Sequence, residues 1–198
     1  MRKILILVIS ILPLTNTIFS QNIEVGGGGF YGTGFNYRTD SFSGSGADNY
    51  ESGNIGFFIK GGYGLAPQTK IVLTCLYTLP KSTEGSIADV DYRHTVGSGM
   101  ADLDLNYAIF GGGSLNLYGI GGLNLHFVGY QYREDYIDND SGEEVTFKTK
   151  QSDNTMGLNI GVGALTKIGE NISMFAETKY IISYYGQFLF SVGFNFDI

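Results

Sequence analysis

The sequence lacks the residues on which several classes of protein depend. It holds one cysteine, Cys75, and no tryptophan in 198 residues, so an internal disulfide and a multi-cysteine metal site are excluded. Charged residues make up only 16% of the chain, whereas a soluble domain has about 25%. The net charge is −7, which argues against binding to nucleic acid, because such binding needs clustered Lys and Arg. We therefore expect no nucleic-acid partner.

Long hydrophobic runs are also missing. No stretch reaches 18 consecutive apolar residues, so the sequence predicts no membrane-spanning helix. The first twenty residues combine the basic pair Arg2 and Lys3 with an apolar run over 4–14 and a polar segment that ends at Ser20. This pattern is typical of a secretory signal peptide, and we expect cleavage between Ser20 and Gln21. Residues 21–198 are then expected to form a single domain.

The full sequence is rich in glycine, tyrosine and phenylalanine, with 30, 14 and 14 residues, and from Gln21 onward its dominant period is two. Apolar residues alternate with small or polar ones over stretches of about ten to fifteen residues. Such alternation predicts β-strands with one apolar face and one small or polar face. We expect eight strands, at 23–37, 54–65, 70–79, 97–109, 115–130, 155–166, 172–182 and 188–198.

The connections between these strands differ in length. Long polar connections are expected at 38–53, 80–96 and 131–153, and short ones at 66–69, 110–114 and 167–171. The connection at 183–187 is also short but falls on the side of the long ones. Long loops at one end and short turns at the other are typical of outer-membrane barrels. The predicted fold is therefore all-β, a closed, antiparallel, eight-stranded transmembrane β-barrel with up-and-down order.

Two features indicate that the apolar face of each strand points outward. An eight-stranded barrel is only just wide enough for ordinary side chains, and the apolar faces carry too many large ones to fit inside. Most charged residues fall in the long connections, and those within strands share the small or polar face. A lipocalin-like soluble barrel, with its apolar face inward, is the alternative arrangement.

The last strand carries a further pattern. It reads Ser191, Gly193 and then alternating hydrophobic residues through Phe196 to Ile198. The chain thus resembles the small eight-stranded outer-membrane β-barrel proteins of the OmpA-transmembrane-domain and OmpX-like class, over residues 22–198. The resemblance implies that Ser191, Gly193, Phe196 and Ile198 form a C-terminal signal for the barrel assembly machinery. The terminal Ile198 departs from the usual Phe.

Six charged residues on the small or polar face are candidates for a polar network in the lumen: Lys60, Lys70, Asp102, Asp104, Glu177 and Lys179. Three cations and three anions can neutralise one another there. The network could be a gate for ions or a structural plug, and the small width of the barrel favours the plug.

Other chemistry is weakly indicated. The two histidines, His94 and His126, have no evident nucleophile beside them, so we expect no enzyme activity. Clustered acids at 135–144 suggest a calcium site, but their spacing is not that of an EF-hand. The segment at 140–142 is more simply a hairpin turn joining strands that extend beyond the membrane. We expect no cofactor and no metal.

The sequence therefore predicts an exported protein of the outer membrane, surrounded by outer-membrane lipid. The expected role is structural, or interaction with an extracellular ligand through the long loops. A narrow passive channel for small solutes is the second hypothesis. A lipid-modifying barrel enzyme and a soluble periplasmic lipocalin-like binder are further alternatives.

Overall fold

The computed structural model describes residues 23–34, 53–87, 90–112, 115–137 and 144–198. The predicted signal peptide and its cleavage site lie outside these residues. Eight β-strands follow one another in the described chain: β1 Ile23–Gly32, β2 Asn54–Ala66, β3 Thr69–Ile87, β4 Val90–Gly112, β5 Leu115–Ile137, β6 Glu144–Lys167, β7 Ile172–Ile182 and β8 Gln187–Asp197. Within this part of the chain, no helix has the length and apolar character needed to span a membrane.

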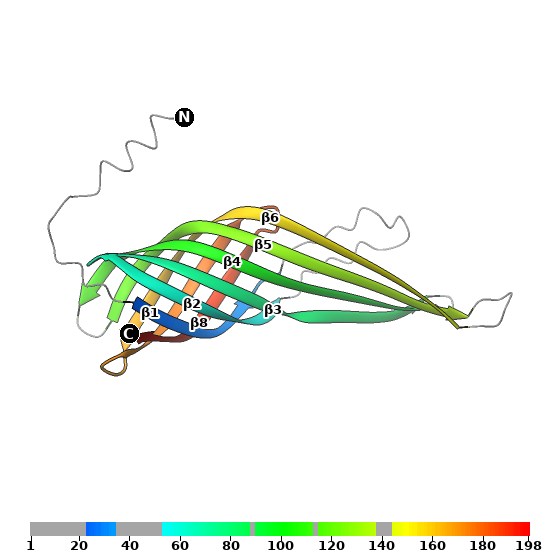
Figure 1. Cartoon of the computed structure of the whole chain (residues 1–198), viewed down its shortest axis with the longest axis horizontal. Coiled ribbons are helices and arrows are strands. Elements are labelled where there is room, and N and C mark those ends of the chain that lie inside the picture. Colours follow the sequence, from blue (N-terminus) through cyan, green and yellow to red (C-terminus); the bar gives the residue numbers. More distant parts are fainter. Residues whose placement is uncertain (1–22, 35–52, 88–89, 113–114, 138–143) are drawn as a thin grey trace, which may run out of the picture.

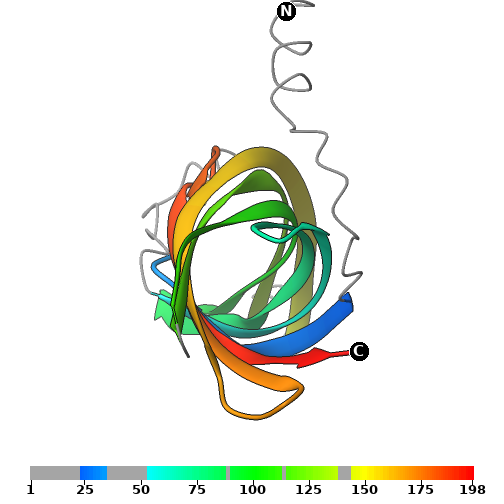
Figure 2. The ribbon, with the colours of Figure 1, turned by 90° about the vertical axis from the view of Figure 1, so that its left-hand side faces the viewer.

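The eight strands form one closed antiparallel barrel (Figures 1 and 2). Each strand pairs with the next along the chain, and β8 pairs with β1, from Glu24 opposite Asp197 to Gly32 opposite Leu189. The amide of Ile198 also donates to the carbonyl of Ile23 at 2.9 Å, at the end of the barrel that holds the short turns. The predicted fold class and strand order are confirmed.

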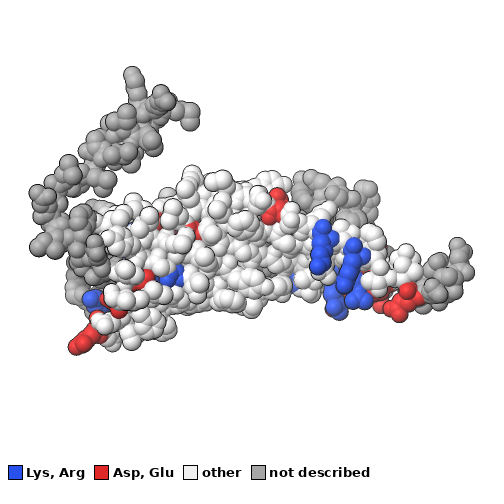
Figure 3. Space-filling view, in the orientation of Figure 1, with Lys and Arg blue, Asp and Glu red and all other residues white. Residues whose placement is uncertain are grey.

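Burial alternates along the strands and shows which face is inside. Asp102 on β4 is completely buried, whereas the apolar Ile59 on β2 and Met156 on β6 are 68% and 70% exposed. A belt of exposed Leu, Ile, Phe and Tyr side chains surrounds the barrel on the outside. Figure 3 shows that the middle of the visible wall is almost free of charge. The apolar-outward arrangement is confirmed, and it is the reverse of a lipocalin-like barrel.

Four strands are much longer than the others. β3 to β6 have 19 to 24 residues, while the remaining strands have 10 to 13. β2 stays paired with β3 only as far as Gly56 opposite Thr78, and β7 with β6 only as far as Leu158 opposite Ile182. Beyond those points β3–β6 continue as a four-stranded sheet that projects past the barrel (Figure 1). We call this sheet the extension; it comprises residues 79–87, 90–97, 129–137 and 144–157.

The extension corrects two predicted loops. The segments 80–96 and 131–153 are mostly strand, as the hairpin hypothesis for 140–142 had suggested for the second of them. Their strand character is hard to see in the sequence because neither face contacts lipid, so apolar alternation is weak there. The first strand ends at Gly32 rather than at residue 37. Residues 35–52, which hold most of the first long connection, and residues 138–143 of the third lie outside the described chain.

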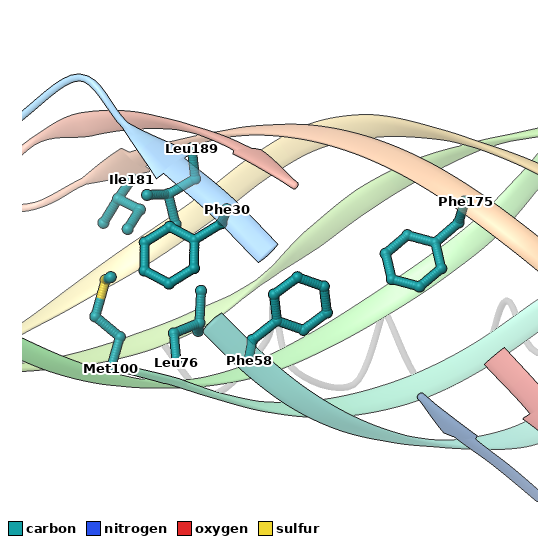
Figure 4. Packing of buried hydrophobic residues seen from close by; sticks show 7 residues of the cluster. All are labelled: Phe30, Phe58, Leu76, Met100, Phe175, Ile181 and Leu189. Carbon is teal, nitrogen blue, oxygen red and sulfur yellow. The ribbon is translucent and has the colours of Figure 1, made fainter. Parts of the chain in front are cut away.

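The interior is less polar than the sequence predicted. Seven buried side chains form an apolar cluster within the barrel (Figure 4): Phe30, Phe58, Leu76, Met100, Phe175, Ile181 and Leu189. Glycines on neighbouring strands make room for the rings. A Cβ atom on Gly56 would lie 2.4 Å from the Phe30 ring, and one on Gly193 would lie 3.0 Å from the Phe175 ring. A face that reads as small in sequence therefore holds a packed apolar core.

Candidate functional site in the lumen and at the outer end

One ion-pair group joins strands that face each other across the lumen. Lys60 Nζ on β2 lies 2.9 Å from Glu177 Oε1 on β7. The hydroxyl of Tyr118 on β5 donates to the same carboxylate oxygen at 2.8 Å. The ammonium of Lys60 also lies 3.2 Å from the centre of the Phe175 ring, a cation–π contact. This group therefore ties a charged pair to the apolar cluster beside it.

A second group surrounds Lys179 of β7. Its ammonium nitrogen lies 2.5 Å from Asp102 Oδ2 and 2.9 Å from Asp104 Oδ2, both on β4. The amides of Asn124 and Asn159 donate to the remaining oxygens of these carboxylates at 2.7 and 2.8 Å. All five side chains are buried. Each carboxylate thus has both a cation and an amide donor.

Lys70 belongs to neither group. It forms an ion pair with Glu24, which also accepts a hydrogen bond from the amide of Asn195 at 3.3 Å. The structure thus places the six predicted residues on the inner face but divides them into three groups. Tyr118, Asn124 and Asn159 complete the network, and sequence reasoning missed them because uncharged residues give no signal on a polar face.

A cavity of about 390 Å³ lies at the short-turn end of the lumen. Its polar lining includes Glu24, Lys70, Asn106 and Asn195, and Lys60 and Tyr118 line its inner part. The lumen is therefore open at this end as a polar vestibule. Deeper in, the two ion-pair groups and the apolar cluster fill the barrel.

Aromatic side chains surround both histidines. His126 is completely buried and its ring packs edge-on against Tyr185, with centroids 5.6 Å apart. His94 lies on the extension, where its Nδ1 is 2.5 Å from the hydroxyl of Tyr130. The Tyr185 hydroxyl donates to Asp153 at 2.5 Å and so ties the short turn after β7 to β6. The described contacts at this outer end are those of a packed aromatic cap.

The acidic segment at 135–144 lies at the far end of the extension. Asp135 accepts a hydrogen bond from Thr146 at 2.7 Å and forms an ion pair with Arg133 at 2.8 Å. These contacts, with the Thr146 hydrogen bond first, lower the pKa of Asp135 from its usual value. Residues 138–143 lie outside the described chain, and the described residues hold no cluster of three His, Cys, Asp or Glu side chains suited to a metal ion.

Comparison with known proteins places this geometry in a structural class. No family model matches the sequence, and no curated protein matches it. The outer membrane protein OprG from Pseudomonas aeruginosa is similar in structure, with a TM-score of 0.59 at 12% identity, over 91% of this chain and 97% of that one. Ail, the attachment invasion locus protein of Yersinia pestis, has a TM-score of 0.52 at 14% identity, over 90% and 99%.

The fold is that of the small outer-membrane β-barrels. In this barrel three residues of the C-terminal pattern, Ser191, Gly193 and Phe196, lie on β8, which closes the ring against β1, and Ile198 directly follows the strand. Ser191 is buried and Gly193 lies opposite Gly28, whereas Phe196 and Ile198 are 50% and 80% exposed on the outside. The C-terminal end of the chain thus exposes Phe196 and Ile198 on the outside of the barrel, next to the pairing of β8 with β1.

Proposed function

We propose that the chain is exported, loses residues 1–20 and folds in the outer membrane as a structural or surface-interaction protein. The extension carries this proposal. It continues four of the eight strands past the belt of exposed apolar side chains and ends in charged and polar residues. In the outer membrane this sheet projects outward, because the short turns and the strand ends at Ile23 and Ile198 mark the periplasmic side. The extension is then the surface that an extracellular ligand meets.

The filled lumen supports this role over that of a channel. Seven apolar side chains and two ion-pair groups occupy the barrel beyond the vestibule. A channel for small solutes is the second candidate, and the vestibule of about 390 Å³ is the observation in its favour. Transport in that case requires the ion pairs and the apolar cluster to rearrange.

Two partners follow from the proposed location. Outer-membrane lipid contacts the exposed apolar belt, which has the outward-facing residues and aromatic side chains that lipid requires. The barrel assembly machinery recognises β8 through Ser191, Gly193, Phe196 and Ile198. Changing Phe196 and Ile198 to Ser tests this recognition, and we expect unfolded protein to accumulate in the periplasm.

The location and fold are tested by fractionating cells and running each fraction on a gel in SDS, heated and unheated. A closed barrel resists SDS, so we expect a band in the outer-membrane fraction whose mobility changes on heating. A periplasmic protein with no change in mobility would overturn the proposal.

The orientation is tested by treating intact cells with trypsin. We expect cleavage in the extension, at Arg133, Lys148 or Lys150, and protection of the lumen residues Lys60 and Lys179. Cleavage of the extension only after the cells are lysed contradicts an outward-facing extension. A variant in which residues 131–150 are replaced by Asn-Gly serves as the control, because it lacks Arg133, Lys148 and Lys150.

A further inference from the structure

Four basic residues lie together on the outward face of the extension. Arg93 on β4 is directly opposite Arg133 on β5, and Arg133 is directly opposite Lys148 on β6. Lys150 is two residues further along β6, on the same face. We call these four residues the basic row. Like charges directly opposite each other on adjacent strands destabilise a sheet unless anions neutralise them.

Acidic neighbours neutralise only half of the basic row. Arg93 pairs with Glu84 at 2.5 Å and Arg133 pairs with Asp135 at 2.8 Å. Lys148 and Lys150 are exposed and have no ion-pair partner among the described residues. The field of Arg133 and Arg93 also contributes to the lowered pKa of Asp135. The row therefore presents an excess of positive charge to its surroundings.

The row lies beyond the outer edge of the lipid-facing belt. Met156, at 70% exposure, is the last large apolar residue on the outward face of β6. Lys150 and Lys148 lie six and eight residues beyond it, roughly 20–27 Å along the strand. At a barrel tilt of about 40° this is roughly 15–20 Å in height. Figure 3 shows Lys and Arg gathered between the uncharged barrel wall and acidic residues nearer the tip.

The side chains of the basic row also point toward the outside of the barrel. The row continues the face that carries the lipid-facing side chains of β4–β6, so its cations project sideways over the surrounding lipid rather than over the mouth of the barrel. Basic residues near a membrane surface attract anionic head groups. An arginine can contact a phosphate with two parallel hydrogen bonds, and a lysine can add a point charge.

We propose that Arg93, Arg133, Lys148 and Lys150 bind the phosphate groups of phosphorylated glycolipid in the outer leaflet. This inference rests on the proposed location of the protein in the outer membrane. The opposite side of the barrel has no counterpart among the described residues, because β1, β2, β7 and β8 end at the rim. The proposed site therefore lies on the β4–β6 side.

The test measures the affinity of the folded mature chain, in detergent, for diphosphoryl lipid A and for dephosphorylated lipid A. We expect at least tenfold tighter binding of the phosphorylated lipid, and a loss of that preference to threefold or less in the variant Lys148→Gln/Lys150→Gln. The matched control Lys81→Gln/Lys167→Gln removes two exposed lysines elsewhere and is expected to stay within twofold of the wild type. The change of gel mobility on heating shows that every variant is folded.

Three outcomes overturn the inference: equal binding of both lipids by the wild type, an unchanged preference in the double variant, and an equal loss in the control. Heparin and inorganic phosphate are tested as competitors. Displacement of lipid A by either one at equal phosphate or sulfate concentration assigns the row to a soluble anion and also overturns the lipid inference. The assay uses purified protein, so absence of the chain from the outer membrane contradicts the proposed function independently of these results.

Discussion

At the scale of single residues, Lys179 shows how the lumen accommodates charge. It lies between Asp102 and Asp104, and all three side chains are nearly inaccessible to solvent. Removing one partner from a buried ion pair leaves an uncompensated charge, which is far more costly than exchanging the whole pair. The stability of the barrel should therefore depend on this one lysine.

We expect Lys179→Met to lower the free energy of unfolding by about 3–5 kcal/mol, because two carboxylates lose their cation. Urea unfolding of the protein in lipid vesicles measures the change. Lys167→Met, at an exposed position, is the control and should have little effect. Adding Asp102→Asn and Asp104→Asn to the lysine variant should recover part of the loss. A change below about 1 kcal/mol in Lys179→Met contradicts a structural role for the ion pair.

Gly193 is a second residue on which the fold depends, because β1 and β8 approach closely there. A Cβ atom at this position would lie 2.3 Å from the carbonyl oxygen of Gly27 and 3.0 Å from the Phe175 ring. The backbone or the ring must therefore move to accept any side chain.

We expect Gly193→Ala to destabilise the barrel by about 1–3 kcal/mol, the usual cost of overpacking. Gly61→Ala is the matched control, since a Cβ atom there meets nothing within 4 Å. The control should change stability by less than about 0.5 kcal/mol. The two variants are compared by their urea unfolding midpoints in the same lipid. Equal midpoints would show that the pairing of β1 with β8 tolerates a methyl group at Gly193.

At the scale of elements, the extension differs from the barrel in what stabilises it. Beyond Met156 its outer face lacks the apolar belt of the barrel wall, and its described contacts there are ion pairs and hydrogen bonds such as those of Asp135 with Arg133 and Thr146. Exposed pairs of this kind are individually weak. The order of the sheet therefore depends on its other face, where Val96, Tyr130 and Tyr185 are buried in one cluster, and on continuity with the barrel strands below it.

The titration of Asp135 tests these contacts. We expect its carboxyl group to titrate below pH 3.8, because the Thr146 hydrogen bond and then Arg133 lower its pKa. A group whose pKa is lowered by folding stabilises the fold above its unfolded pKa, and this contribution is lost as the pH falls through the folded value. Carbon-13 NMR of the aspartate carboxyls measures the midpoint, and Thr146→Val should raise it. A wild-type midpoint at or above 3.8 contradicts the contacts.

At the scale of the whole molecule, the barrel combines a lipid-facing exterior with a filled interior. The vestibule opens at the short-turn end, and the apolar cluster with Phe30, Phe58 and Phe175 lies deeper in the barrel (Figure 4). An ion that crosses the barrel must pass both the ion-pair groups and this cluster. Passage through apolar side chains without water is strongly unfavourable for a charge.

We expect the wild-type protein to produce no stable conductance in planar lipid bilayers. Phe30→Ala combined with Leu76→Ala removes part of the apolar cluster and should produce measurable openings. Phe57→Ala, on the lipid-facing side of β2, is the control and should behave as the wild type. Stable openings of the unchanged protein would instead favour the channel hypothesis.

The sequence alone was sufficient to predict the eight strands, their up-and-down order and the outward direction of their apolar faces. These properties depend on the alternation of residues within each strand, which is local along the chain. The same reasoning placed the six charged residues on the inner face. It missed the outer halves of β3 and β4, and it indicated those of β5 and β6 only through the hairpin at 140–142, because strands that leave the lipid no longer need an apolar face.

The contacts across the lumen were decided only by the tertiary structure. Lys179 meets Asp102 and Asp104, Lys60 meets Glu177, and Lys70 is held apart with Glu24. The stagger of the strands around the ring decides which charged side chains come into contact. The sequence of a single strand does not specify that stagger. The basic row arises in the same way, since Arg93, Arg133 and Lys148 are neighbours only through the register of three strands. Local periodicity determines the faces of a barrel, and the register of its closed hydrogen-bonded ring determines its contacts.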